Sequence, residues 1–264
     1  MQLSQDPVLA ETAAHVTTIT INRPKSRNCL TRETVLSLSR QLDLVSRSPG
    51  VRCVVLRGAG EEAFCAGADL SELLSSPDPD SRRSFFGSVA SLIESVHRCP
   101  VPVVSAVHGF ALAGGCGLAA ACDITLAADD AVFGLPETAI GLAPMVVMAP
   151  LSRCLGRKAL ASMALTGARL SAHEALQAGL VSRVVAKPAL DAEVRRVCSD
   201  LCKQSPSALR ASKAAMLDVA EREYFPFLRE LADRSALLSL GAEAEEGLRA
   251  FAEKRAPSWR VEGA

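Results

Sequence analysis

Apolar residues recur along this chain with two different periods, and the two patterns alternate over most of its length. Residues 16–22 alternate Thr with Ile, which predicts a half-buried strand. Residues 51–57 and 124–128 are short apolar runs, which are typical of buried strands. Two predicted helices, one after the N-cap residue Thr31 and one after residue 81, align apolar residues on one face: Val35, Leu38, Leu42 and Val45 in the first, and Phe85, Val89, Leu92 and Val96 in the second.

The second half of the chain is predicted to be mostly helical. After the strand at 124–128 the predicted elements are helices over 146–155 and 158–165, a short helix that begins with the capping box Ser171–Glu174 and ends at Gly179, and a strand over 181–185. From Leu190 onward only helical spacing remains. Leu190, Val194, Val197 and Leu201 share one face, and further helices are predicted near 208–220, 225–238 and 243–254.

Strands that alternate with helices imply βαβ units with right-handed crossovers, and therefore an α/β fold. We divide the chain into an α/β core, residues 1–189, and a C-terminal helical region, residues 190–264. This helical region needs a surface to lie on, which either its own core or a neighbouring subunit supplies. The segment Ser75–Ser81, with prolines between aspartates, is expected to be a mobile surface loop.

The composition narrows the classes of partner and compartment. Lys and Arg total 29 and Asp and Glu total 29, so the formal net charge is zero and neither nucleic acid nor an anionic membrane is expected as a partner. The first ten residues lack a basic head followed by an apolar stretch, so no secretory signal is expected. The nine cysteines are scattered through apolar segments without zinc spacing, which favours a reduced, cytoplasmic protein without a metal site.

The segment Val101–Asp123 contains the most specific signal. A run of β-branched residues passes into glycines and then into alanines, which predicts a strand, a tight turn and the start of a helix. Unpaired N–H groups and the positive end of the helix dipole at such a turn suit a group with negative charge. Neither a phosphate loop nor a dinucleotide fingerprint fits the spacing, and Pro102, His108 and the glycines argue against a membrane span. Glycines that only permit close packing remain an alternative.

A second bend of small residues, Ala66-Gly67-Ala68-Asp69, also follows a strand, and Asp69 can cap the helix after it. Other motifs accompany the two bends in order: Asn22-Arg23-Pro24 with Asn28, Phe64 to Leu70, Ala121-Cys122-Asp123, Gly134-Leu135-Pro136-Glu137, Leu165-Thr166-Gly167, Ala175 to Val181, and Phe251 to Arg255. This constellation resembles the crotonase (enoyl-CoA hydratase/isomerase) family over most of the chain.

The resemblance implies a particular fold and substrate. The fold is an α/β spiral of ββα turns with two nearly perpendicular sheets, and C-terminal helices cover the site. The family implies homotrimers, commonly paired into homohexamers, and a coenzyme A thioester as the substrate, with no further cofactor.

The resemblance also assigns catalytic groups. By position, the backbone N–H groups of Ala68 and Gly114 correspond to the family's oxyanion hole, which binds the thioester oxygen as it becomes an enolate. The family's hydratases use two glutamates; Glu137 matches the second, but Gly117 stands where the first would be. One carboxylate suits the removal of a proton and its return elsewhere, which favours isomerisation of an enoyl-CoA double bond. Hydration, decarboxylation, thioester hydrolysis and non-catalytic acyl-CoA binding stay as alternatives, and Gly117→Glu is expected to raise hydration.

For the CoA thioester, the resemblance and the neighbouring residues give a set of candidate contacts. Lys25 and Arg27 are candidates for the phosphates, and Phe251 and Lys254 come from the C-terminal helix of the same or an adjacent subunit. Walls of the acyl pocket are expected from Leu70 to Phe86 and from Met145 to Met148. The full set of predicted substrate contacts is Lys25, Arg27, Cys29, Leu30, Ala66, Asp69, Leu70, Gly115, Gly117, Phe251 and Lys254.

Three residues have competing interpretations. Buried beside apolar neighbours, Glu137 would have a raised pKa, as a general base requires, whereas the alternative is a surface glutamate in a loop. Cys116 at the helix start is either an activated thiolate that forms an acyl-enzyme or a packed thiol, and the packed thiol fits better. His108 is expected to be a hydrogen-bonded structural residue rather than a base.

Overall fold

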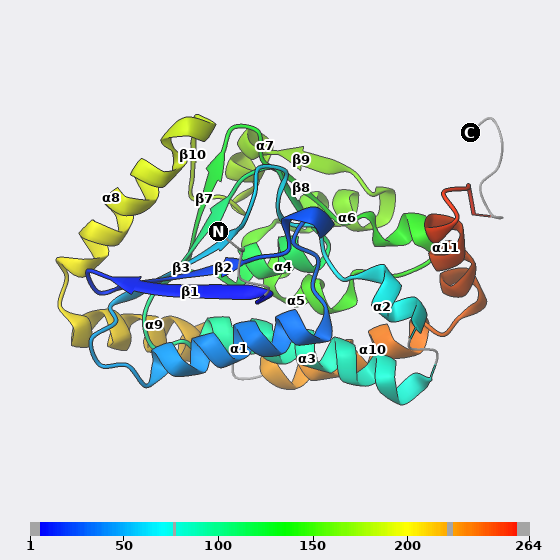
Figure 1. Cartoon of the computed structure of the whole chain (residues 1–264), viewed down its shortest axis with the longest axis horizontal. Helices are drawn as coiled ribbons and strands as arrows, with labels where there is room; N and C mark the ends of the chain where they lie inside the picture. The colour runs from blue at the N-terminus through cyan, green and yellow to red at the C-terminus, as the bar shows by residue number, and fades with distance from the viewer. Residues whose placement is uncertain (1–5, 76–77, 221–223, 258–264) are drawn as a thin grey trace.

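A computed structural model describes residues 6–75, 78–220 and 224–257 of the chain, and its strands form two sheets (Figure 1). The larger sheet has the order β1-β2-β3-β5-β7-β10, and the smaller sheet has the order β4-β6-β8-β9. The strands are β1 (Val8–Ala13), β2 (Val16–Ile21), β3 (Cys53–Gly58), β4 (Ala63–Cys65), β5 (Val103–Val107), β6 (Phe110–Leu112), β7 (Ile124–Ala128), β8 (Val132–Gly134), β9 (Arg169–Ser171) and β10 (Arg183–Val185).

Helices cover both sheets and fill the rest of the described chain. The α-helices are α1 (Arg32–Ser46), α2 (Leu70–Ser75), α3 (Pro79–Arg98), α4 (Gly114–Ala121), α5 (Met145–Cys154), α6 (Arg157–Thr166), α7 (Ala172–Ala178), α8 (Leu190–Cys202), α9 (Pro206–Ala220), α10 (Tyr224–Leu238) and α11 (Ala242–Ala252). Short 3₁₀ helices are η1 (Pro24–Ser26), η2 (Pro136–Ile140) and η3 (Lys187–Ala189).

The larger sheet is parallel from β2 to β10, and β1 adds one antiparallel strand at its edge. Because successive side chains of a strand point to opposite faces, the buried strand β3 serves two cores. Val54 and Leu56 belong to the main core, which also contains the apolar faces of α1 and α3. Cys53 and Val55 belong to a second core, which α8 closes. The apolar strands predicted from the sequence are therefore buried on both faces.

Signals at the helix ends are confirmed. Thr31 caps α1, where its hydroxyl accepts a backbone N–H of the first turn at 3.2 Å. The carboxylate of Asp69 accepts the N–H of Ser71 at 3.2 Å at the start of α2. The capping box of Ser171 and Glu174 is present at the start of α7. These side chains satisfy donors that a helix end otherwise leaves unpaired.

The sequence pattern did not predict the smaller sheet or the edge strand β1. The strands of the smaller sheet have 3 residues each, too few to show an alternation. In β1 only Val8 is buried, so its pattern carries no apolar face. The strand predicted before the glycine-rich turn is β5. It is followed by β6, which the sequence did not predict, and only then by α4.

The loop expected over Ser75–Ser81 is shorter than predicted. Asp78 caps α3 by accepting the N–H of Ser81 at 2.8 Å, and α3 begins at Pro79. Proline suits the first turn of a helix because its missing N–H would have no partner there. Residues 76 and 77 lie outside the described part of the chain.

The C-terminal helices lie on the chain's own core. Helix α8 packs on β3, β5 and β7, α10 packs against α3 and α5, and α11 packs against α2 and η2. Figure 1 shows α8 and α11 near opposite ends of the long axis. Of the two supports that the sequence allowed, the structure shows the first, and the domain division at residue 189 stays a prediction. Within the described residues, every helix is too short or too polar to cross a membrane.

Candidate active site

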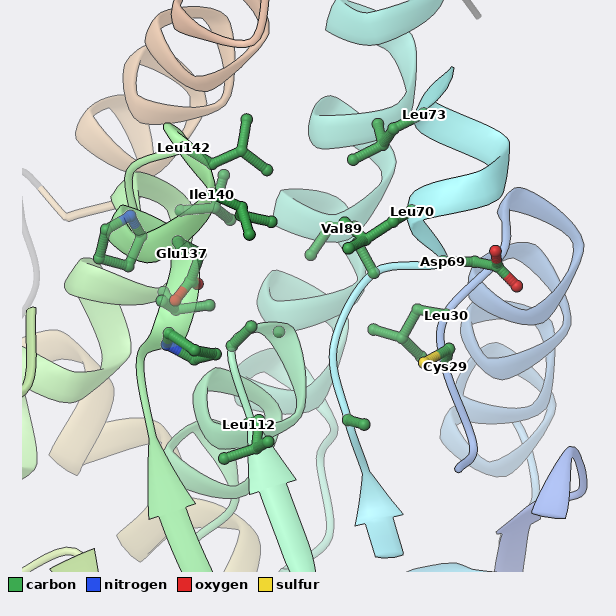
Figure 2. A pocket seen from close by; sticks show the side chains of 18 of the residues that line it. Cys29, Leu30, Asp69, Leu70, Leu73, Val89, Leu112, Glu137, Ile140 and Leu142 are labelled. Atoms are coloured by element: carbon green, nitrogen blue, oxygen red, sulfur yellow. The ribbon is translucent and has the colours of Figure 1, made fainter. Parts of the chain in front are cut away.

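A cavity of about 780 Å³ lies where the strands of the smaller sheet end (Figure 2). Strands β4, β6 and β8 are parallel, so their carboxyl ends meet at one edge of this sheet. The segments that leave this edge line one side of the cavity, and residues of α2, α3, α10 and α11 line the other. Both bends of small residues predicted from the sequence are among these segments.

Two free backbone donors lie side by side at the cavity. Leu30 and Ala68 form an isolated parallel bridge, in which Leu30 N–H donates to Gly67 at 2.8 Å and Asp69 N–H donates to Leu30 at 2.9 Å. This pairing uses the groups on both sides of Ala68, so the N–H of Ala68 points away from Leu30. Gly114 is the first residue of α4, whose initial N–H groups have no partner in the helix. Within the described chain neither N–H donates a hydrogen bond, and a Cβ built on Gly114 would lie 3.9 Å from Ala68 N.

The residue before Gly114 has an unusual backbone conformation. Ala113 has φ 49° and ψ −121°, which a residue with a side chain rarely adopts. Its N–H donates to the carbonyl of Gly134 at 2.9 Å, which ties the turn to the end of β8. Strained backbone of this kind concentrates at functional sites, where the surrounding structure enforces it. Here the strain allows α4 to begin at the wall of the cavity.

Glu137 places a carboxylate inside the cavity. It belongs to η2 (Pro136–Ile140), which the left-handed Gly141 follows, and its carbonyl accepts the N–H of Leu142 at 3.0 Å. Figure 2 shows this side chain on the wall opposite Leu70. Its Oε2 atom is enclosed and has no hydrogen-bond partner among the described residues. Burial raises the pKa of Glu137 to about 7, because the ionised form loses hydration there.

Apolar side chains line much of the cavity. Figure 2 shows Leu70, Leu73 and Val89 across from Glu137, and Ile140 and Leu142 on the same side as Glu137. Phe85 and Phe86 of α3 and Met145, Val146 and Val147 of α5 also line the cavity. Both stretches expected to supply pocket walls therefore do so. Such a wall suits an acyl chain and excludes water from the carboxylate.

Basic side chains gather on another part of the lining. Lys25, Arg27 and Arg169 line the cavity there together with Glu62. Arg27 Nε pairs with Glu62 Oε2 at 2.9 Å, and both side chains are exposed. The guanidinium carbons of Arg27 and Arg169 lie 5.9 and 5.8 Å from the centre of the Phe110 ring. Attraction to this ring holds both cations near the cavity, where they suit the phosphates of a ligand.

Comparison with known proteins identifies the family. Residues 11–262 match the family model described as Enoyl-CoA hydratase/isomerase. The chain belongs to the enoyl-CoA hydratase/isomerase family.

Relatives of this enoyl-CoA hydratase/isomerase family member agree in sequence and in fold. An enoyl-CoA hydratase structure from Mycobacterium avium superposes with a TM-score of 0.86 at 34% identity, covering 96% of this chain and 99% of that one. The crotonyl-CoA hydratase of Syntrophomonas wolfei is 31% identical over 258 residues, 96% of this chain and 97% of the relative. The short-chain-enoyl-CoA hydratase of Clostridium acetobutylicum is 34% identical over 211 residues, 79% of this chain and 80% of the relative. The crotonase-type fold is therefore confirmed.

Most residues assigned from the sequence meet at this one cavity of the family member. Those that line it are Ala68, Gly114, Glu137, Lys25, Arg27, Cys29, Leu30, Ala66, Asp69, Leu70 and Phe251. The side chain of Asp69 forms an ion pair of 3.0 Å with Arg23. Two further lining residues, Arg169 of β9 and Ser235 of α10, carried no signal in the sequence.

Gly115, Gly117 and Lys254 are not part of the cavity lining. A Cβ on Gly115 would overlap the carbonyl of Cys65, and a Cβ on Gly117 would overlap the side chain of Val147. For these two glycines the close-packing alternative describes the structure, because other atoms occupy the space beside their backbone. Lys254 is exposed after the end of α11.

The two other candidate chemical groups do not act in the cavity. Cys116 is buried, and burial together with the charge of Glu137 raises the pKa of its thiol, so the activated thiolate is wrong. His108 is buried and does not line the cavity, and burial and the charge of Lys187 lower its pKa. Its Nε2 has no hydrogen-bond partner among the described residues, so the hydrogen bond expected there is not seen.

Proposed function

We propose that this protein is an enoyl-CoA isomerase, which moves the double bond of a 3-enoyl-CoA into conjugation with the thioester. The observation that carries the proposal is the enclosed carboxylate of Glu137, whose pKa burial raises to about 7, in the same cavity as the free N–H groups of Ala68 and Gly114. By the family resemblance, Gly117 stands where the hydratases have the other of their two glutamates. One base and one oxyanion site are the equipment for proton transfer through an enolate.

The reaction runs through one proton and one oxyanion. Ionised Glu137 accepts a proton from C2, and the electron pair moves onto the thioester oxygen to form a dienolate. Ala68 and Gly114 donate their N–H groups to this oxygen. Protonated Glu137 then returns its proton to C4, the double bond forms between C2 and C3, and the carbonyl is restored. One proton leaves C2 and one is delivered to C4, so the cycle balances with the CoA thioester alone and without a further cofactor, and the proton on Glu137 can exchange with solvent between the two steps.

The expected contributions are large enough to account for catalysis. Each oxyanion donor is typically worth about 100- to 1,000-fold in rate. General base catalysis contributes roughly 100- to 10,000-fold, most when the pKa of the base lies near the working pH. A pKa of about 7 lets Glu137 act as the base when ionised and as the acid once it holds the proton.

The basic part of the lining is proposed to bind the coenzyme. Lys25, Arg27 and Arg169 face the phosphates, while Cys29, Leu30, Ala66 and the exposed ring of Phe251 contact the nucleotide and pantetheine. Lys254 contacts the coenzyme from the same or an adjacent subunit. The working assembly is proposed to be a homotrimer or a homohexamer, as the family resemblance implies.

Hydration of a 2-enoyl-CoA is the second candidate function. The observation in its favour is that two relatives are named crotonyl-CoA hydratase and short-chain-enoyl-CoA hydratase. In this reaction Glu137 would orient the water alone, and the same two N–H groups would hold the enolate.

Parallel assays of the purified protein separate the candidates. With 3-hexenoyl-CoA in D₂O, isomerisation predicts formation of the 2-enoyl thioester and deuterium exchange at C2, both reduced at least 100-fold by Glu137→Gln. With crotonyl-CoA, the rate of water addition is measured under the same conditions. A larger kcat/KM for hydration than for isomerisation favours the second candidate. Tight acyl-CoA binding without exchange or turnover contradicts both.

A further inference from the structure

Helix α5 packs directly on the bare backbone of Gly117. A Cβ on Gly117 would overlap Val147 Cγ1, and it would lie 2.7 Å from Val147 Cβ and 3.3 Å from Val147 Cα. The N–H of Gly117 is already used, because it donates to the carbonyl of Ala113 at 3.1 Å. The isopropyl group of Val147 therefore fills the space that a side chain at position 117 would enter.

Val147 also belongs to the wall of the catalytic cavity. It lines the cavity although its side chain is only 4% exposed, so it closes the wall rather than projecting into solvent. Helix α5 follows soon after η2, and Glu137 and Val147 therefore line the same cavity from neighbouring segments of the chain.

We infer that Val147, which packs on Gly117 and lines the cavity, determines which reaction this site performs by keeping water away from the reacting carbons. The inference rests on the proposed function and names the residue that directs the enolate to isomerisation. A buried water typically needs two to four polar partners. Around Gly117 its own N–H is taken, Val147 is apolar, and the neighbouring Cys116 is a buried thiol. Water that adds to C3 would therefore have Glu137 as its partner, while neither Val147 nor the used N–H of Gly117 offers it a second one.

The same geometry makes Gly117 and Val147 a matched pair. In Gly117→Glu alone, the new Cβ overlaps Val147. We therefore no longer expect this substitution by itself to raise hydration, and expect that only in combination with a smaller residue at position 147. Val147→Ala removes the overlapping Cγ1 but keeps a Cβ 2.7 Å away, whereas Val147→Gly leaves the nearest atom, Cα, at 3.3 Å. The room for a second carboxylate therefore increases from valine to alanine to glycine at position 147.

Five proteins test the inference: wild type, Val147→Ala, Gly117→Glu, Gly117→Glu/Val147→Ala and Gly117→Glu/Val147→Gly. For each, kcat/KM is measured for hydration of crotonyl-CoA and for isomerisation of 3-hexenoyl-CoA, and thermal unfolding followed by circular dichroism checks the fold. The ratio of hydration to isomerisation is expected to rise at least tenfold in Gly117→Glu/Val147→Gly. It is expected to rise less in Gly117→Glu/Val147→Ala and not at all in Gly117→Glu.

The variants and the wild type answer different questions. The role of Val147 is overturned if the ratio rises as much in Gly117→Glu as in Gly117→Glu/Val147→Gly. It is also overturned if the ratio stays at the wild-type value in a folded Gly117→Glu/Val147→Gly variant. The single variant Val147→Ala opens the cavity wall with a small change, so its ratio of hydration to isomerisation should rise above that of the wild type. An unchanged ratio in this variant overturns the role of Val147 even where Gly117→Glu/Val147→Gly does not fold. The proposed function is tested by the wild type alone, which must isomerise 3-hexenoyl-CoA whatever the variants do.

Discussion

Replacement of Glu137 by glutamine is expected to stabilise the fold at neutral pH while it lowers activity at least about 100-fold. Burial raises the pKa of Glu137 from 4.5 to about 7, so the folded chain binds this proton more tightly than the unfolded chain. The protonated carboxyl group therefore contributes to the free energy of unfolding in full below about pH 4.5, and this contribution is lost as the pH rises through about 7. The difference between the two pKa values corresponds to about 3 kcal/mol, at roughly 1.4 kcal/mol per pH unit.

Glutamine matches the shape of the protonated carboxyl group and does not ionise, so the variant does not lose stability as the pH rises. Urea unfolding at pH 5 and pH 8 measures the difference in free energy of unfolding between the variant and the wild type, with the exposed Glu11→Gln on β1 as the control. We expect Glu137→Gln to exceed the wild type by about 3 kcal/mol at pH 8 and by less than about 1 kcal/mol at pH 5. Glu11→Gln should leave the free energy of unfolding unchanged at both values. A Glu137→Gln variant that is no more stable than the wild type at pH 8 would refute the enclosed carboxylate.

Three further outcomes are expected. Gly114→Pro removes one oxyanion donor at the first position of α4 and should lower kcat/KM about 100- to 1,000-fold, with thermal unfolding as the check on the fold because proline also restricts the strained Ala113 before it. Gly114→Ala keeps the N–H, meets Leu30 Cδ1 at 3.4 Å and should retain activity. Equal losses in both variants would argue against the donor. In the wild type, kcat/KM should fall as the pH drops below about 7, because the base must be ionised, and a flat profile between pH 5 and 8 would contradict this assignment. Asp123→Asn should cost about 3 to 5 kcal/mol in urea unfolding, because the buried Lys213 ammonium, 2.6 Å from this carboxylate, loses its counter-charge, and Lys213→Met/Asp123→Asn should recover part of this loss.

Elements whose signal lies in their own residues could be predicted from the sequence. Helix α1 carries both its apolar face and its cap, Thr31, within one segment. Strand β6 has 3 residues and is followed almost at once by α4, so its sequence is indistinguishable from that of the turn. It becomes a strand because β4 and β8 pair with it on either side, and that pairing depends on residues distant in sequence.

Some residues of the candidate site could likewise be predicted from local sequence, and others could not. Ala68, Gly114 and Glu137 could be predicted because each belongs to a motif with a fixed order along the chain. Arg169 reaches the cavity because β9 pairs antiparallel with β8, which places it opposite Gly134. No local pattern around Arg169 reports this register, so sequence reasoning had no means to find it.

The glycines of α4 show why one motif needed the structure to be understood. In the sequence Gly114, Gly115 and Gly117 form a single small-residue signal, and a free backbone and close packing explain it equally well. In the fold the two explanations apply to different residues: Gly114 presents an unused N–H to the cavity, while Gly115 and Gly117 allow β4 and α5 to approach the helix. Gly117 is therefore more than a missing acid. Since Val147 occupies the space beside Gly117, any side chain at position 117 first disturbs the packing of α4 on α5, and a second carboxylate can be accommodated there only together with a change at position 147.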